Sequence, residues 1–189
     1  KLKYIVDNGD KFITIKNSKL LDEIKGKNKP VIFISAHFGN WEIMRYLLVS
    51  VLKEKCAFIF RPPNDPYLAD IFMNRVKALP KNQQNDFPAI EKGLSGFKKL
   101  ITYMKGGYSL FSLIDQKLKE GIKIEFLGRK VTAVPAPASL ALRFDLDVYM
   151  VMILRKNKTH FEISIDKLKK PDFTVSNTEN ILKYTQIMN

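Results

Sequence analysis

A histidine and a glutamate five positions apart, His37 and Glu42, are the residues of this sequence best suited to do chemistry. A carboxylate beside one imidazole nitrogen fixes the tautomer and stabilises the protonated ring, which leaves the other nitrogen free to accept a proton. An imidazole held in this way acts as a general base toward a hydroxyl group. A structural reading stays open, because glutamate suits the first turn of a helix and a histidine at a strand end is often simply hydrogen-bonded.

The segments around this pair predict how it is positioned. Val31–Ala36 is a continuous apolar run, typical of a strand buried on both faces of a parallel sheet. Apolar residues then recur at helical spacing from Trp41 to Leu52, with Asn40 as a natural N-cap. His37 thus follows the carboxyl end of a strand, where ligands bind in open α/β sheets. Glu42 falls in the first turn of the next helix, so we expect the short turn between them to bring the two side chains together.

The remaining periodicities alternate between strand and helix, which predicts an α/β fold with a mixed, mostly parallel sheet flanked by helices. The sequence shows no linker, so residues 1–189 are expected to form a single domain, truncated at both ends because it starts at Lys1 and stops within a helical pattern. We predict strands at 4–6, 12–15, 57–60, 108–114, 122–126, 148–154 and 161–165, helices at 19–24, 67–78, 89–105, 138–144 and 178–188, and a loop at 80–88.

Composition narrows the classes of partner. Lysine and arginine number 32 against 19 acidic residues, a formal charge of +13 that favours anionic lipid, an acidic carrier protein or nucleic acid. The excess is mostly lysine spread along the chain, without an arginine-rich stripe or a nucleic-acid motif, so no nucleic-acid partner is expected. No second histidine shares a helix face with His37, so no zinc-protease motif and no metal site are predicted. No apolar stretch approaches the ~20 residues that span a bilayer.

The octapeptide Ser35–Glu42, Ser-Ala-His-Phe-Gly-Asn-Trp-Glu, closely resembles the lipid A biosynthesis (late) acyltransferase family of the lysophospholipid and glycerolipid acyltransferase superfamily. Its His-x4-Glu motif is the family's signature, and the resemblance implies a three-layer acyltransferase fold. Further segments resemble the family in the same order, namely Phe60–Pro66, Leu113–Gln116, Phe126–Thr132, Ala138–Ala141 and Leu154–Arg155.

The resemblance implies transfer of a fatty acyl chain, usually from acyl carrier protein, to a hydroxyl of a lipid A precursor at the cytoplasmic face of the bacterial inner membrane. It implies His37 and Glu42 as the catalytic pair and no cofactor. Asp115 has an open reading as a structural residue, and either Arg75 or Lys77 fills the place of the family's helix arginine, with Arg75 favoured because it keeps the guanidinium. The implied substrate-binding residues are Asn40, Arg61, Arg75, Asp115, Arg129 and Arg155.

Two other functions stay open. The first is an acyltransferase that uses acyl-CoA as the donor and a lysophospholipid or glycolipid as the acceptor. It differs from the main prediction in its substrates and not in its chemistry. The second is a non-catalytic module that binds anionic lipid, motivated by the +13 charge and by the absence of the family's closing Pro-x-Gln-x-x-Trp and His-Arg-Arg segments.

Overall fold

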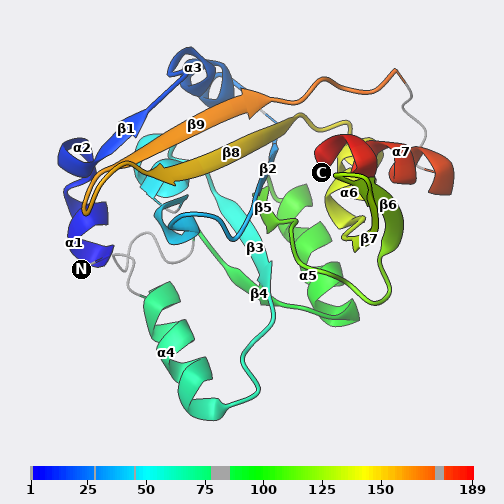
Figure 1. The fold of residues 1–189 in the computed structure, drawn as a ribbon, viewed down its shortest axis with the longest axis horizontal. Helices are drawn as coiled ribbons and strands as arrows, with labels where there is room; N and C mark the ends of the chain where they lie inside the picture. Colours follow the sequence, from blue (N-terminus) through cyan, green and yellow to red (C-terminus); the bar gives the residue numbers. More distant parts are fainter. Residues whose placement is uncertain (1, 28, 45, 78–85, 173–176) are drawn as a thin grey trace.

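The fold is built on a seven-stranded sheet, seen in a computed structural model that describes residues 2–27, 29–44, 46–77, 86–172 and 177–189 (Figure 1). The order across the sheet is β1-β9-β8-β2-β5-β3-β4. The five strands from β8 to β4 are parallel, β9 is antiparallel to β8, and β1 is parallel to β9. The predicted mixed, mostly parallel sheet is therefore confirmed. The strands are β1 (Ile13–Ile15), β2 (Ile32–Ser35), β3 (Cys56–Phe60), β4 (Ala89–Glu91), β5 (Ser109–Leu113), β8 (Val148–Arg155) and β9 (Phe161–Lys167).

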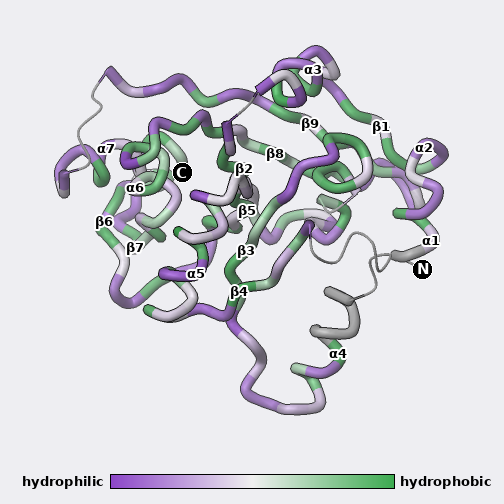
Figure 2. The backbone as a smooth tube through the Cα atoms, turned by 180° about the vertical axis from the view of Figure 1, so that it is seen from behind, coloured by the Kyte–Doolittle hydropathy of each residue, from purple (hydrophilic) through white to green (hydrophobic). Residues whose placement is uncertain are grey.

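Helices cover both faces, so the domain has three layers. Alternate residues of β2 point to opposite sides: Phe33 packs into one core, and Ile32 and Ile34 into the other. This double burial explains the continuous apolar run of this strand, and Figure 2 shows apolar residues concentrated along the central strands. The first core lies under α1 (Leu2–Asp7), α3 (Lys19–Lys25), the 3₁₀ turn η1 (Trp41–Ile43) and the π-helix η2 (Tyr46–Val51), and the second under α5 (Leu94–Lys105), α6 (Ala136–Phe144) and α7 (Thr178–Met188).

A hairpin and one long helix lie outside these layers. The antiparallel hairpin of β6 (Ile122–Phe126) and β7 (Arg129–Ala133) packs beside α7, where the Gln186 side chain exchanges two hydrogen bonds with the backbone of Glu125. Helix α4 (Pro66–Lys77) stands away from the sheet (Figures 1 and 2). The short helix α2 (Gly9–Phe12) precedes β1.

Three sequence predictions were wrong. The segment 4–6, predicted as a strand, lies in α1. The helix predicted over 89–105 is divided into β4 and α5, because Ala89–Glu91 pairs with the end of β3 and Gly93 adopts a φ of 141° between the two elements. The helix predicted from residue 41 to 52 is a 3₁₀ turn followed by a π-helix. In addition, β7 was not predicted.

Most other elements were predicted correctly, within one to three residues at their ends. The predictions at 161–165 and 148–154 are confirmed as β9 and β8, and these strands pair with each other. Residues 80–85 of the predicted loop, and Ala78 at the end of the predicted helix 67–78, lie outside the described residues.

Candidate active site

The imidazole of His37 is held by the carboxylate of Asp115. Nδ1 of His37 lies 2.8 Å from Oδ1 of Asp115, and the backbone N–H of His37 donates to Oδ2 of the same carboxylate, also at 2.8 Å. An ionised carboxylate only accepts, so in this pairing Nδ1 carries a proton, and Nε2 presents a lone pair whenever the ring is neutral. The register explains this contact: Ser35 of β2 pairs with Leu113 of β5, and His37 and Asp115 each follow two residues later.

The second ring nitrogen faces the side chain of Gln116. The amide Nε2 of Gln116 lies 3.3 Å from Nε2 of His37, at the distance of a weak hydrogen bond donated to the ring. The His37 side chain is 36% exposed, so the imidazole is partly accessible from solvent. The arrangement leaves the His37 ring oriented by Asp115, with Gln116 at its second nitrogen.

The loop that carries His37 is fixed against β8. Gly39 has a φ of +60°, and a Cβ on this residue would lie 2.1 Å from the carbonyl oxygen of Ile153. Arg155, at the end of β8, donates a hydrogen bond to the side-chain oxygen of Asn40, and its guanidinium lies 5.0 Å from the centre of the Phe161 ring. The predicted N-cap residue Asn40 therefore makes no side-chain cap, and its side chain instead ties the loop to the sheet.

Glu42, the predicted partner of the imidazole, lies half-buried in η1. Among the described residues, the imidazole hydrogen bonds go to Asp115 and Gln116, with none to Glu42. Trp41 from the same turn packs edge-on against the His37 ring, with ring centres 5.8 Å apart. A catalytic role for Glu42 stays a prediction.

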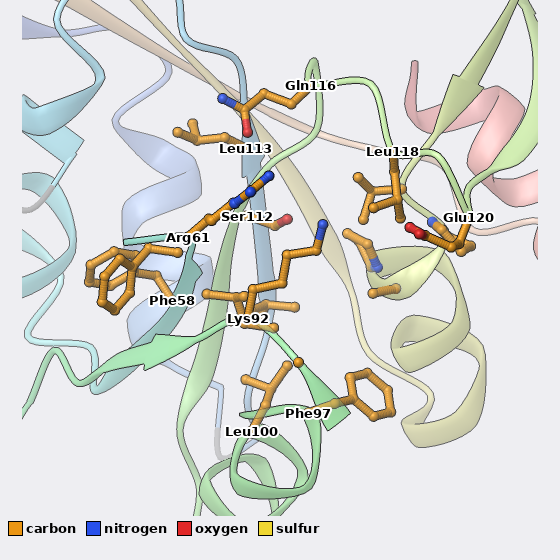
Figure 3. A pocket seen from close by; sticks show the side chains of 18 of the residues that line it. Phe58, Arg61, Lys92, Phe97, Leu100, Ser112, Leu113, Gln116, Leu118 and Glu120 are labelled. Atoms are coloured by element: carbon orange, nitrogen blue, oxygen red, sulfur yellow. The ribbon is translucent and has the colours of Figure 1, made fainter. Parts of the chain in front are cut away.

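A cavity of about 1450 Å³ opens beside His37. This volume exceeds the ~300–1,000 Å³ usual for small-molecule sites. Its floor is apolar and includes the buried residues Leu100 and Leu110. The exposed charged residues Arg61, Lys92 and Glu120 also line the cavity (Figure 3). The wall is built from the ends of the strands, α5, the start of α6 and α7, with side chains that include Phe97, Leu118, Ile122, Val134 and Ile181.

The predicted arginines are distributed unevenly around this cavity. Arg61 follows β3 directly and lines the cavity, and its role in substrate binding stays a prediction. Arg155 contacts the loop that carries His37 but does not line the cavity, and Arg129, at the turn of the β6–β7 hairpin, is not among the lining residues either. The side chains of Arg75 and Lys77 lie outside the described residues.

Sequence reasoning missed two residues at the site. Gln116 was recognised only as part of the Leu113–Gln116 segment, and Lys92 was placed inside a predicted helix. A signal for Lys92 was present in Gly93, since a glycine after a short β-branched or apolar run marks the end of a strand as readily as a position inside a helix.

An oriented imidazole beside a deep apolar cavity is what an acyltransferase handling long hydrocarbon chains requires. The family profile described as bacterial lipid A biosynthesis acyltransferase matches residues 7–189 of the chain. The chain therefore belongs to the lipid A biosynthesis acyltransferase family, as the resemblance of Ser35–Glu42 implied. No curated protein matches the sequence. The protein is an acyltransferase, and its family transfers an acyl group from a donor to a lipid acceptor.

Within the part of the chain that the structure describes, no helix is both long enough and apolar enough to cross a membrane.

Proposed function

We propose that this enzyme moves a fatty acyl chain from the thioester of acyl carrier protein to a hydroxyl of a lipid A precursor, with His37 as the general base. The observation that carries the proposal is the pairing of Nδ1 of His37 with Asp115, which leaves Nε2 as the proton acceptor beside the cavity. Family membership supports the acyl-transfer chemistry and a lipid as the acceptor.

The reaction follows from this arrangement. The acceptor hydroxyl takes the place of the Gln116 amide at Nε2 of His37 and gives its proton to that nitrogen. Its oxygen attacks the thioester carbonyl carbon and forms a tetrahedral oxyanion. When the intermediate collapses, the carbon–sulfur bond breaks and the departing thiolate takes the proton back from His37. The products are an ester and a free thiol, and Asp115 stabilises the imidazolium between the two proton transfers.

The oxyanion needs hydrogen-bond donors aimed at the developing charge. The Gln116 amide, displaced from Nε2, is one candidate, because it already lies 3.3 Å from the nitrogen at which the proton moves. The backbone N–H groups of Gly39 and Asn40 are the other candidates, since the loop that carries them is fixed against β8.

The apolar part of the cavity is proposed to hold the acyl chain. Burial of each methylene group contributes about 0.8 kcal/mol, so a long chain gains most of its binding free energy from apolar walls such as those of Phe97, Leu100 and Leu110. The opening next to His37 then presents the thioester at the end of this chain to the base.

Glu42 remains the second acidic residue that we propose for the site, as the family motif implies. A direct role on the imidazole would require His37 to exchange Asp115 for Glu42. A role that does not need this exchange is to shape the η1 turn behind the base, since Glu42 directly follows Trp41, which packs against the ring.

We place the enzyme at the cytoplasmic face of the bacterial inner membrane. Two features favour contact with an anionic bilayer: the formal charge of +13, and the apolar side chains of Tyr67 and Leu68, which are 74% and 53% exposed on the protruding helix α4. Flotation with vesicles that contain anionic lipid measures this association, and Tyr67→Ser with Leu68→Ser is expected to weaken it.

The test of the proposed function is transfer of a labelled acyl chain from acyl carrier protein to a purified lipid A precursor. His37→Ala is expected to lower turnover about 10²–10⁴-fold. His160→Ala is the matched control, because His160 is exposed, bonds to Asn157 and lies on the β8–β9 connection. Undiminished turnover in His37→Ala would remove the base from the proposal.

Parallel reactions separate the rival functions. Faster transfer from acyl-CoA to a lysophospholipid or glycolipid would favour the acyl-CoA alternative. Vesicle binding without acyl transfer to any of these acceptors would favour the non-catalytic lipid-binding module.

A further inference from the structure

Arg61 and Lys92 stand side by side at the ends of neighbouring strands. Phe60 of β3 pairs with Glu91 of β4, so the next residue on each strand, Arg61 and Lys92, continues the same register. The backbone N–H of Lys92 donates to the carbonyl oxygen of Phe60 at 2.8 Å, which fixes the two strand ends together. Both side chains project into the cavity beside His37 (Figure 3).

Among the described residues, Arg61 and Lys92 have no acidic partner. Within the described parts of the chain, neither Arg61 nor Lys92 forms an ion pair, and Glu120 enters the cavity from the opposite wall without a salt bridge to either (Figure 3). Two positive charges held next to each other repel, and an anion placed between them removes this repulsion. A guanidinium offers parallel donors that match a phosphate, and an ammonium adds a compact charge, so the pair suits a phosphate group.

The position of this pair relative to the base limits which phosphate it can bind. The carboxyl ends of β2, β5, β3 and β4 lie in a row and carry, in that order, His37, Asp115, Arg61 and Lys92. Neighbouring strands are about 4.8 Å apart, so Lys92 stands about 14 Å from His37 along the row, and Arg61 about 10 Å.

This separation matches the donor. The phosphopantetheine arm, which both acyl carrier protein and CoA use, has about thirteen bonds between the thioester sulfur and the phosphorus, and an extended chain covers about 3.3–3.6 Å per three bonds, or about 15 Å in total. With the thioester at His37, the phosphate of an extended arm reaches the ends of β3 and β4. His37, Arg61 and Lys92 along this path are exposed, whereas the floor residues Leu100 and Leu110 are buried. The arm therefore follows the exposed strand ends while the acyl chain descends to the floor.

We propose that Arg61 and Lys92 form the binding site for the phosphate of the donor's phosphopantetheine arm. Lys92 is the residue that this inference adds to the site. The inference rests on the proposed function, because it places the thioester at His37. It names the phosphate that is shared by acyl carrier protein and CoA rather than a surface of either donor.

The test compares Lys92→Met with the unsubstituted enzyme for three donors: acyl carrier protein, acyl-CoA and S-acyl pantetheine, which has no phosphate. The KM for both phosphorylated donors is expected to rise about 10- to 100-fold, as loss of a charge-assisted hydrogen bond predicts. With S-acyl pantetheine the two enzymes should be equal, and the KM for the lipid acceptor should not change. Lys92→Arg should restore most of the loss, and Lys98→Met is the matched control because Lys98 is an exposed lysine of α5 outside the cavity lining.

Three results would overturn the inference. An unchanged KM for the phosphorylated donors would mean that Lys92 does not bind them. A raised KM for the acceptor alone would assign the cations to an acceptor phosphate, and a loss confined to acyl carrier protein would assign Lys92 to the carrier's acidic surface. Measuring His37→Ala with the same donors keeps this test separate from that of the proposed function. If His37 is not the general base, His37→Ala will turn over every donor at the rate of the unsubstituted enzyme, whatever the result for Lys92→Met.

Discussion

The carboxylate of Asp115 forms two hydrogen bonds with His37, both of 2.8 Å. Oδ1 bonds to the ring nitrogen Nδ1, and Oδ2 accepts from the backbone N–H. The backbone contact fixes the position of the residue, and the ring contact fixes the tautomer. The two contacts follow from the register of β2 and β5, in which Ser35 pairs with Leu113. His37 comes two residues after Ser35 and Asp115 two residues after Leu113, so the two side chains leave the sheet side by side. Orientation of the base is thus a property of the parallel sheet rather than of the loop sequence alone.

Gly39 is expected to be essential for the loop. In Gly39→Ala the new Cβ would meet the carbonyl oxygen of Ile153 at 2.1 Å, in addition to the cost of a positive φ. The positive φ costs about 1–2 kcal/mol and overpacking about 1–3 kcal/mol, so the free energy of unfolding should fall by about 3 kcal/mol. Urea denaturation measures this difference.

Gly128→Ala is the control for Gly39→Ala. Gly128 also has a positive φ, +74°, but an added Cβ meets no atom within 4 Å. Its loss should be limited to about 1–2 kcal/mol. Equal losses in the two variants would show that the contact with Ile153 does not constrain the loop.

At the opposite end of β2 and β8, an ion pair should make stability depend on pH. Asp147 accepts from Lys27 and lies near Lys167, at 3.4 Å. Burial alone would raise the pKa of Asp147, but the hydrogen bond from Lys27 and the neighbouring lysines lower it below its usual value. A lowered pKa stabilises the fold above the unfolded-state pKa, and this stabilisation is lost as pH falls through the folded-state pKa.

Asp147→Asn is therefore expected to reduce the free energy of unfolding at pH 7 by about 1.5–3 kcal/mol, the usual contribution of a hydrogen bond between charged groups. The two unfolding curves should converge as pH falls below about 3.9, the ordinary aspartate pKa. Asp145→Asn serves as control, because the Asp145 side chain is 69% exposed and asparagine also adopts its left-handed backbone conformation. A difference that persists undiminished at pH 2 would exclude the ion pair as the cause.

The cavity wall is expected to limit acyl chain length. Phe97, on α5, points into the cavity (Figure 3), and Phe97→Trp would reduce the space for the end of the chain. Displacing two or three methylene groups costs about 2 kcal/mol, which corresponds to a loss of about 30-fold in kcat/KM for the longest accepted donor. Short-chain donors should react as before. An unchanged chain-length profile would remove Phe97 from the acyl-binding wall.

The fold was predictable wherever the local pattern determined the element. The apolar run of β2 and the alternation in β9 reflect burial on two faces and on one face, respectively, and both are visible without a partner strand. The boundary between β4 and α5 could not be predicted from the local pattern, because Ala89–Glu91 is extended only through pairing with β3. Gly96 lies so close to the Glu91 carbonyl that an added Cβ would be 1.8 Å away, a tertiary contact that the spacing does not reveal.

The site was predictable in part for the same reason. His37 was identified from its place after a buried strand, and Arg61 from a resemblance. Asp115 was named as a site residue, but its contact with His37 depends on the strand order β2-β5, which joins residues 78 positions apart. Lys92 belongs to no recognised motif, and only the pairing of β4 with β3 brings it beside Arg61.

The most direct test of the account is the kcat of Asp115→Asn for acyl transfer. The asparagine oxygen can still accept the backbone N–H of His37, but its NH₂ group would then face Nδ1, which forces the ring into the tautomer with the proton on Nε2. We predict a fall in kcat of about 10³–10⁴-fold, similar to that of His37→Ala, and no further loss in the double variant. Asp115→Asn with the turnover of the unsubstituted enzyme would contradict the claim that this carboxylate orients the base.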